Sequence, residues 1–205
     1  MKKIILTLAL AAAAAVCANA QQIGVTAGYT MKNFTNVMSN EAGLFLGGNY
    51  NIELTNGLSV APGIEFAMLS WKKDDNNYQK ENYLAVPVMF NYGFKLVDGI
   101  KLVPYLGPTF SYGLTSKGRS DLSTGLSSLI NLATGSSTSG EVNYYGDKSN
   151  YTQFDILIGG GVALDIMDMV RAFVGFNQGL LNRNNDSDGS VIKTSGVNFG
   201  VSYLF

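Results

Sequence analysis

The sequence predicts an all-β protein, an eight-stranded antiparallel up-and-down transmembrane β-barrel with short turns at one end and long loops at the other. Three observations support this fold class: an export signal at the start, alternating residue character along the last segment, and connections that alternate in length. No apolar run after the export signal is long enough for a membrane-spanning helix. Any crossing of a membrane must therefore use a closed barrel, whose strands satisfy each other's backbone groups.

Residues 1–20 are predicted to be a cleaved signal peptide. A basic pair at positions 2–3 precedes an apolar stretch at 4–16, which is too short to span a membrane, and residues 18–20 have the small side chains of a cleavage site. We therefore expect an outer-membrane β-barrel domain at 21–205, located in the outer membrane of a Gram-negative cell.

Eight segments of the remaining chain have the alternation of a strand. They are expected at 22–32, 43–54, 58–72, 81–96, 100–114, 151–166, 170–180 and 193–205. Most exceed the roughly 9–11 residues that a tilted strand needs to cross a bilayer. In the first, the apolar residues Ile23, Val25 and Met31 alternate with small or polar ones, so that one face suits lipid and the other a polar lumen.

The connections between these segments alternate in length. The long ones are 33–42, 73–80, 115–150 and 181–192, and the short ones are 55–57, 97–99 and 167–169. Three turn residues keep the apolar faces of neighbouring strands in register, and the first two turns place a glycine where a left-handed residue is needed. This sorting predicts short periplasmic turns and long extracellular loops.

The last segment resembles a signal for barrel assembly. Its apolar face ends in an aromatic residue and comprises Val197, Phe199, Val201, Tyr203 and Phe205. Other outward aromatic residues would form one belt near each end of the barrel, where amphipathic rings prefer the membrane interface. The prolines within predicted strands each remove a backbone donor, so we expect bulges or kinks at Pro62, Pro87, Pro104 and Pro108.

Charged residues on the inward face would occupy a lumen that is wide enough only for side chains. A polar conduit or ligand site is one interpretation of them, and the favoured one is a structural charge network of Glu53, Glu65, Lys101, Asp155, Asp165 and Arg171. The register of the turn at 167–169 places Asp165 opposite Arg171, which predicts an ion pair. The register at 97–99 places Lys95 opposite Lys101, which is unfavourable unless an acid such as Glu53, or water, is close.

The composition excludes several classes of function. The chain has no histidine, and its only cysteine is Cys17, in the predicted signal peptide, so Ser-His and Cys-His catalysis and the common zinc sites are excluded. Without the basic pair at 2–3, acidic residues outnumber basic ones by 15 to 12, which does not suggest a nucleic-acid partner. We expect no enzyme activity, no cofactor and no metal site.

Two connections have features of their own. Residues 184–189 resemble the start of a calcium loop, but Ser195 stands where the closing acid belongs, so a solvated loop in 181–192 is the favoured interpretation. In 115–150, apolar residues at helical spacing over 121–134 predict either a short amphipathic helix that docks a partner or covers the barrel, or a surface loop.

Several strand patterns resemble those of the PorT-like outer-membrane β-barrel family. They are YLAVPV at 83–88, VPYLGP at 103–108, IGGGV at 158–162 and VRAFVGF at 170–176. The resemblance covers 21–205 and implies an eight-stranded barrel in a Gram-negative outer membrane. Through PorT itself, it also implies an association with secretion across that membrane.

The predicted function is that of a small outer-membrane barrel with a filled lumen that acts through its extracellular loops. Structural, adhesive and complex-forming roles all fit this prediction, and the alternatives are a narrow channel for small solutes or a soluble binding barrel. The expected partners are outer-membrane lipids, the barrel-assembly machinery, and either secretion-machinery subunits or an extracellular ligand that binds through 115–150.

Overall fold

The computed structural model describes residues 21–35, 40–74, 77–119, 141–143, 145, 151–184 and 189–205. The predicted signal peptide and the predicted helix at 121–134 lie outside these ranges. Within them, no helix has the length and apolar character that crossing a membrane requires. The strands are β1 Gln21–Phe34, β2 Asn40–Thr55, β3 Leu58–Asp74, β4 Asn77–Tyr92, β5 Phe94–Val97, β6 Ile100–Arg119, β7 Glu141–Asn143, β8 Phe154–Ile166, β9 Val170–Gly179 and β10 Thr194–Leu204.

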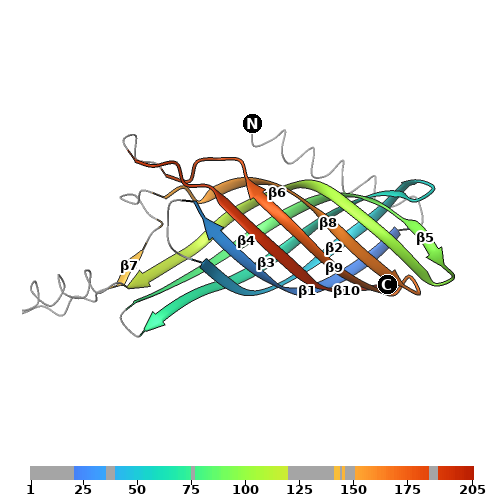
Figure 1. Ribbon diagram of the computed structural model, residues 1–205, viewed down its shortest axis with the longest axis horizontal. Helices are drawn as coiled ribbons and strands as arrows, with labels where there is room; N and C mark the ends of the chain where they lie inside the picture. The colour runs from blue at the N-terminus through green and yellow to red at the C-terminus, as the bar shows by residue number, and fades with distance from the viewer. Residues whose placement is uncertain are drawn as a thin grey trace, which may run out of the picture.

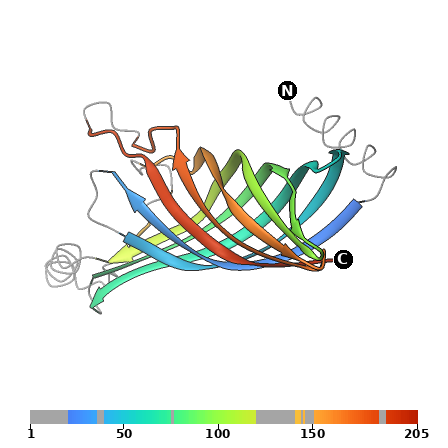
Figure 2. The same ribbon diagram turned by 45° about the vertical axis from the view of Figure 1, so that its right-hand side comes forward.

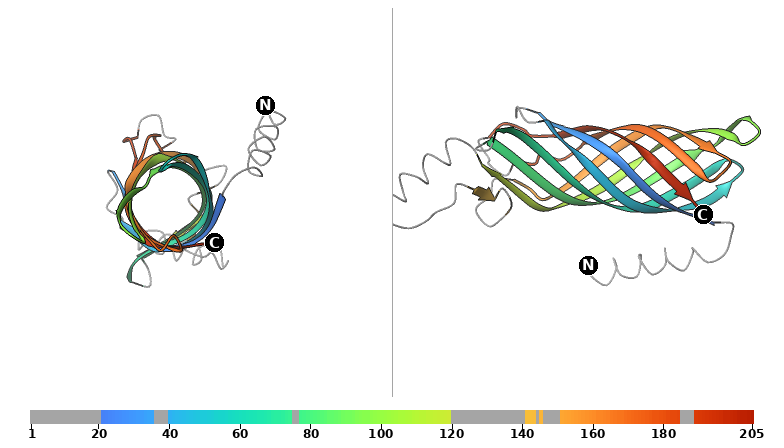
Figure 3. Two further views of the ribbon diagram at one scale, coloured as in Figure 1. Left: turned by 90° about the vertical axis from the view of Figure 1, so that its right-hand side faces the viewer. Right: turned by 90° about the horizontal axis from the view of Figure 1, so that it is seen from below.

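The strands form a closed antiparallel barrel, seen along its axis in Figure 3. Spanning strands that follow each other in the chain are paired, and β1 closes the barrel against β10 (Figure 1). β5 continues the course of β4 beyond Gly93, and both pair with β6, whose far end also pairs with the short β7. We count β4 and β5 as one spanning strand, and we do not count β7, which pairs only with the end of β6. The predicted eight-stranded barrel is therefore confirmed.

The two ends of the barrel differ as the sequence predicted. The connections from β2 to β3, β5 to β6 and β8 to β9 are short and share what we call the short-turn end, where the chain also ends (Figure 2). The opposite end is the long-loop end. Some strands extend further there than predicted: β3 and β4 remain paired as far as Asp74 and Asn77, and β6 reaches Arg119. These extensions lack the apolar alternation of a lipid-facing strand, so the sequence pattern did not predict them.

The short turns have the predicted left-handed residues. Gly57 and Gly99 have φ angles of 83° and 79°, in the region that glycine enters without steric cost. In the third turn, Met167 and Asp168 adopt φ angles of 54° and 55° although neither is a glycine. Ile166 still pairs with Val170, so the predicted three-residue register of this turn is confirmed.

Outward and inward faces alternate along every spanning strand. On β10, Val197, Phe199, Val201 and Tyr203 are 41–51% exposed, whereas Ser202 between them is 2% exposed. Rings also meet on the outer wall at both ends: Tyr92 and Phe94 have centroids 4.6 Å apart, and Tyr29 and Phe199 have centroids 5.7 Å apart. The outer wall therefore offers lipid an apolar surface with aromatic residues towards each end.

The prediction of bulges at the prolines is wrong. The register of β3 against β4 is the same on both sides of Pro62 and Pro87, and β6 pairs with β8 without a shift through Pro104 and Pro108. The ladder between β3 and β4 is interrupted between the Pro62–Val88 and Glu65–Ala85 pairs instead. A proline removes only one donor, so a local gap in the ladder accommodates it without an inserted residue.

Side chains fill much of the lumen. Phe45 on β2 and Phe173 on β9 reach towards each other with ring centroids 6.2 Å apart. Each ring packs over a glycine of the intervening strands, Phe45 over Gly28 on β1 and Phe173 over Gly200 on β10. These two glycines are direct partners in the β1–β10 ladder, so their lack of side chains makes room for both rings. Phe45 also belongs to a buried apolar cluster with Ala67, Leu69, Tyr83 and Ala85.

Candidate functional site

A group of buried polar side chains lies in the lumen at the long-loop end. We call it the outer cluster, and it comprises Lys32 on β1, Glu41 on β2, Glu81 on β4, Tyr145 and Arg183. Tyr145 belongs to the connection between β6 and β8, and Arg183 belongs to the connection between β9 and β10. Two long connections thus send a side chain each into the mouth of the barrel.

Arg183 is the centre of the outer cluster. Its Nη2 donates to Oε1 of Glu81 at 3.0 Å and lies 2.5 Å from the hydroxyl oxygen of Tyr145, and its Nε donates to the carbonyl of Thr152 at 3.3 Å. The hydroxyl of Tyr145 in turn donates to the same oxygen of Glu81. Arg183 is 4% exposed, Glu81 2% and Tyr145 5%, so these contacts are shielded from solvent.

The electrostatics of the two loop residues follow from this arrangement. Burial disfavours the charge of Arg183, but the adjacent carboxylate of Glu81 outweighs burial and raises the pKa of Arg183 above its ordinary value. Burial and then the charge of Glu81 raise the pKa of Tyr145, so its hydroxyl remains a donor. Arg183 is therefore charged and Tyr145 protonated, as their hydrogen bonds to Glu81 require.

The remaining members of the cluster lie on strands. Lys32 has its Nζ 3.4 Å from the centroid of the Tyr83 ring, and it lies directly opposite Glu41 in the β1–β2 ladder. Glu41 is fully buried, and neither of its carboxyl oxygens receives a hydrogen bond from a described donor. The guanidinium of Arg183 lies 5.5 Å from the centroid of Phe34, which adds an aromatic contact to its ion pair.

The predicted pair at the other end is present. Asp165 and Arg171 are opposed in the β8–β9 ladder, and the guanidinium donates from Nε to Oδ1 at 2.6 Å and from Nη2 to Oδ2 at 2.7 Å. Both residues are buried, at 6% and 9% exposure, and they face inward. The predicted register is therefore confirmed, and the contact is a bidentate charge-assisted pair.

The predicted opposition of Lys95 and Lys101 is also present, but two other acids relieve it. Lys95 pairs with Asp98 at 2.5 Å, and Lys101 pairs with Asp168 at 2.7 Å. Both aspartates belong to turns, for which the sequence pattern predicted only a connecting role. Glu53, the expected partner, is exposed and lines the open mouth at the short-turn end.

The six charged residues predicted for the lumen thus lie at three levels. Glu53, Lys101, Asp165 and Arg171 line the mouth at the short-turn end, Glu65 lies in the middle of the lumen, and Asp155 is buried towards the outer cluster. No sequence pattern indicated the outer cluster as a whole. Glu41, Tyr145 and Arg183 fell in predicted loops, whereas the inward parity of Lys32 and Glu81 could have indicated them.

Within the described part of the chain, no three His, Cys, Asp or Glu side chains are grouped so that they could hold a metal ion. The calcium-like motif at 184–189 lies mostly outside the described residues.

The comparison with known families decides the membership of the chain. The profile described as outer membrane protein beta-barrel domain matches residues 4–205. The chain belongs to this family. Its place in the Gram-negative outer membrane follows from the family and from the closed barrel with an apolar outer wall.

Solved outer-membrane barrels share the fold of this family member. Neisserial surface protein A is similar with a TM-score of 0.52 and 14% identity, over 90% of this chain and 97% of that one. Ail, the attachment invasion locus protein of Yersinia pestis, is similar with a TM-score of 0.50 and 12% identity, over 91% and 100%. The outer membrane enzyme PagL is similar with a TM-score of 0.49 and 11% identity, over 87% and 97%. Among curated proteins, none matches the chain.

Proposed function

We propose that this protein is a closed outer-membrane barrel that acts through its extracellular loops, as an adhesive or complex-forming protein. The observation that carries this proposal is the outer cluster. Arg183 and Tyr145 reach from two connections to the same carboxylate of Glu81 on the barrel wall. They close the mouth of the lumen and hold the two connections in a fixed relation to each other.

Backbone contacts extend this anchoring along the connection after β9. The Arg183 amide donates to the carbonyl of Ile192 at 2.8 Å, and the amide of Thr152 donates to the carbonyl of Arg183 at 2.8 Å. The side chain of Asn184 also donates to the carbonyl of Ser190 at 2.9 Å. A loop held in this way loses less conformational entropy on binding a partner, which favours a binding role for this end.

The specific partner proposed is a secretion-machinery subunit, as the resemblance to PorT-like barrels suggests, or an extracellular ligand of the 115–150 connection. Affinity capture from native membranes tests this proposal. Subunits that co-purify with the wild type should be lost with Arg183→Ala, which releases the loop anchor. They should be retained with Lys95→Ala, which changes an exposed turn at the opposite end. Equal capture by both variants would refute a role for the anchored loops.

A narrow channel remains the second candidate, because Arg171 borders both the mouth at the short-turn end and the central cavity of the lumen. Planar-bilayer recording separates the two functions. A barrel closed by the outer cluster should give no steady single-channel current, whereas steady currents from the wild type would establish the channel.

We also propose that the protein is not an enzyme and that the assembly machinery recognises its last strand. The absence of histidine removes the usual partner of a serine nucleophile. The apolar face of β10, with Phe205 at its end, is exposed on the outer wall, which supports both a contact with lipid and recognition during assembly.

A further inference from the structure

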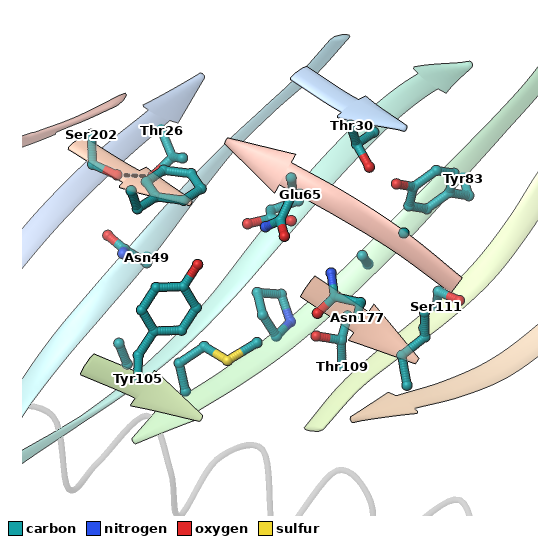
Figure 4. A pocket seen from close by; sticks show the side chains of 18 of the residues that line it. Thr26, Thr30, Asn49, Glu65, Tyr83, Tyr105, Thr109, Ser111, Asn177 and Ser202 are labelled. Carbon is teal, nitrogen blue, oxygen red and sulfur yellow. Dashed lines mark hydrogen bonds between the residues drawn. The ribbon is translucent and has the colours of Figure 1, made fainter. Parts of the chain in front are cut away.

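The middle of the lumen contains a polar cavity that the proposed loop function does not use. This central chamber has a volume of about 110 Å³, and its lining includes Asn49, Glu65, Tyr105 and Asn198 from four different strands. Figure 4 shows the first three of these side chains around the chamber. That volume accommodates a few water molecules, or one small ion with part of its hydration shell. Lys32 of the outer cluster borders the chamber at one end and Arg171 borders it at the other.

Glu65 is the charged group that faces this space from the barrel wall. It points inward from β3, between its ladder partners Gly47 on β2 and Ala85 on β4, and neither partner offers it a polar side chain. Among the described residues it forms no ion pair. The cations at the two ends of the chamber have other contacts, since Arg171 is held by Asp165 and Lys32 lies against Tyr83 and opposite Glu41. A carboxyl group enclosed in this way needs either a positive partner or a proton.

Other oxygen atoms of the same lining also lack partners. Oδ1 of Asn49, Oδ1 of Asn198 and the hydroxyl of Tyr105 are buried without a hydrogen-bond partner among the described residues. Tyr105 reaches this position because Gly161 and Gly175, which are partners in the β8–β9 ladder, leave room for its ring. Unpaired buried oxygens are rare in native proteins, so several around one cavity indicate an occupant that donates hydrogen bonds or carries positive charge.

We propose that the central chamber binds a small monovalent cation, with Glu65 as the counter-charge and the oxygens of Asn49, Asn198 and Tyr105 as additional ligands. An alkali ion and a small protonated amine share this chemistry. A divalent metal fits less well, because one carboxylate supplies too little charge for it. Neither Arg183 nor Tyr145, which anchor the loops, lines the chamber. A measurement of cation binding therefore does not depend on the proposed loop function.

Calorimetric titration of the protein purified from outer membranes with thallium(I) nitrate, in chloride-free detergent buffer, tests the site. The wild type should show saturable one-site binding, and Glu65→Gln should weaken it at least tenfold. Glu53→Gln is the matched control, because it removes a carboxylate from the exposed mouth and should leave binding unchanged. Tyr105→Phe keeps the charge, removes one oxygen ligand and should weaken binding by a smaller factor.

Competition with methylammonium identifies the kind of cation. Displacement of thallium shows that the site accepts protonated amines, and a lack of displacement restricts it to inorganic ions. Each variant must first show the heat-modifiable gel migration of a folded barrel. An absence of saturable binding in the wild type, or equal affinity in folded Glu65→Gln, would overturn the proposal and leave water as the only occupant.

Discussion

The pair of Asp165 and Arg171 offers a quantitative test of the inward charge assignment. Its two hydrogen bonds measure 2.6 and 2.7 Å, and the side chains are 8% and 11% exposed. Removing one partner from a buried pair leaves the other charge uncompensated, which costs about 3–5 kcal/mol. Both Asp165→Asn and Arg171→Gln should therefore lower the free energy of unfolding by an amount in this range.

A double-mutant cycle isolates the interaction from the other effects of each substitution. The assay is urea unfolding of the barrel in lipid vesicles, in which the midpoint and slope of the transition give the free energy. Lys95 and Asp98 form the matched control, because they are just as close, at 2.5 Å, but are 67% and 96% exposed. Their coupling should be far smaller, since water screens an exposed pair. A coupling between Asp165 and Arg171 no larger than that of the control would refute the argument from burial.

Three further predictions concern assembly, orientation and strain. The amide of Phe205 donates to the carbonyl of Ile23 at 2.8 Å, where the last strand closes the barrel against the first. Deletion of Phe205 should deplete the protein from outer-membrane fractions. Normal levels would contradict a role of the last strand in assembly. Protease added to intact cells should cut within 115–150 or 181–192 and never at 55–57, so fragments from the short turns alone would mean an inverted orientation. Met167→Gly should raise the free energy of unfolding by about 0.5–1 kcal/mol in the same urea assay, because a φ of 54° strains a residue with a side chain. A destabilised variant would show that Met167 is not strained.

The fold could be predicted from the sequence because a membrane barrel follows a strict rule. The side chains of each spanning strand must point alternately to lipid and to the lumen. The positions of Ile23 and Ser202 in this alternation therefore predict which way each side chain faces. The same rule gave the register at the turn of Met167 and thus the pair of Asp165 and Arg171. Beyond the membrane the rule no longer applies, and the extra length of β3, β4 and β6 could not be predicted.

The outer cluster could be predicted only in part, because its contacts join residues far apart in the chain. Arg183 and Glu81 are 102 positions apart, and no local pattern indicates that a loop arginine turns into the lumen. The role of Asp98 and Asp168 as partners of Lys95 and Lys101 was missed for a related reason. The backbone preferences of turn residues do not indicate that their side chains reach lysines on the adjoining strands.

The proposed closure of the barrel by Arg183 is tested most directly by thiol labelling in intact cells. The only native cysteine, Cys17, belongs to the predicted signal peptide, so Asn177→Cys would introduce a single thiol on the lining of the central chamber. Ser190→Cys, on an exposed part of the long-loop end, is the control that reports contact with the outside.

A small charged methanethiosulfonate reagent added to the cells should label Ser190→Cys at once. It should leave Asn177→Cys unlabelled unless Arg183→Ala is also present. Rapid labelling of Asn177→Cys with Arg183 intact would show that the long-loop end is open, and it would contradict the proposal of a closed barrel that acts through its loops.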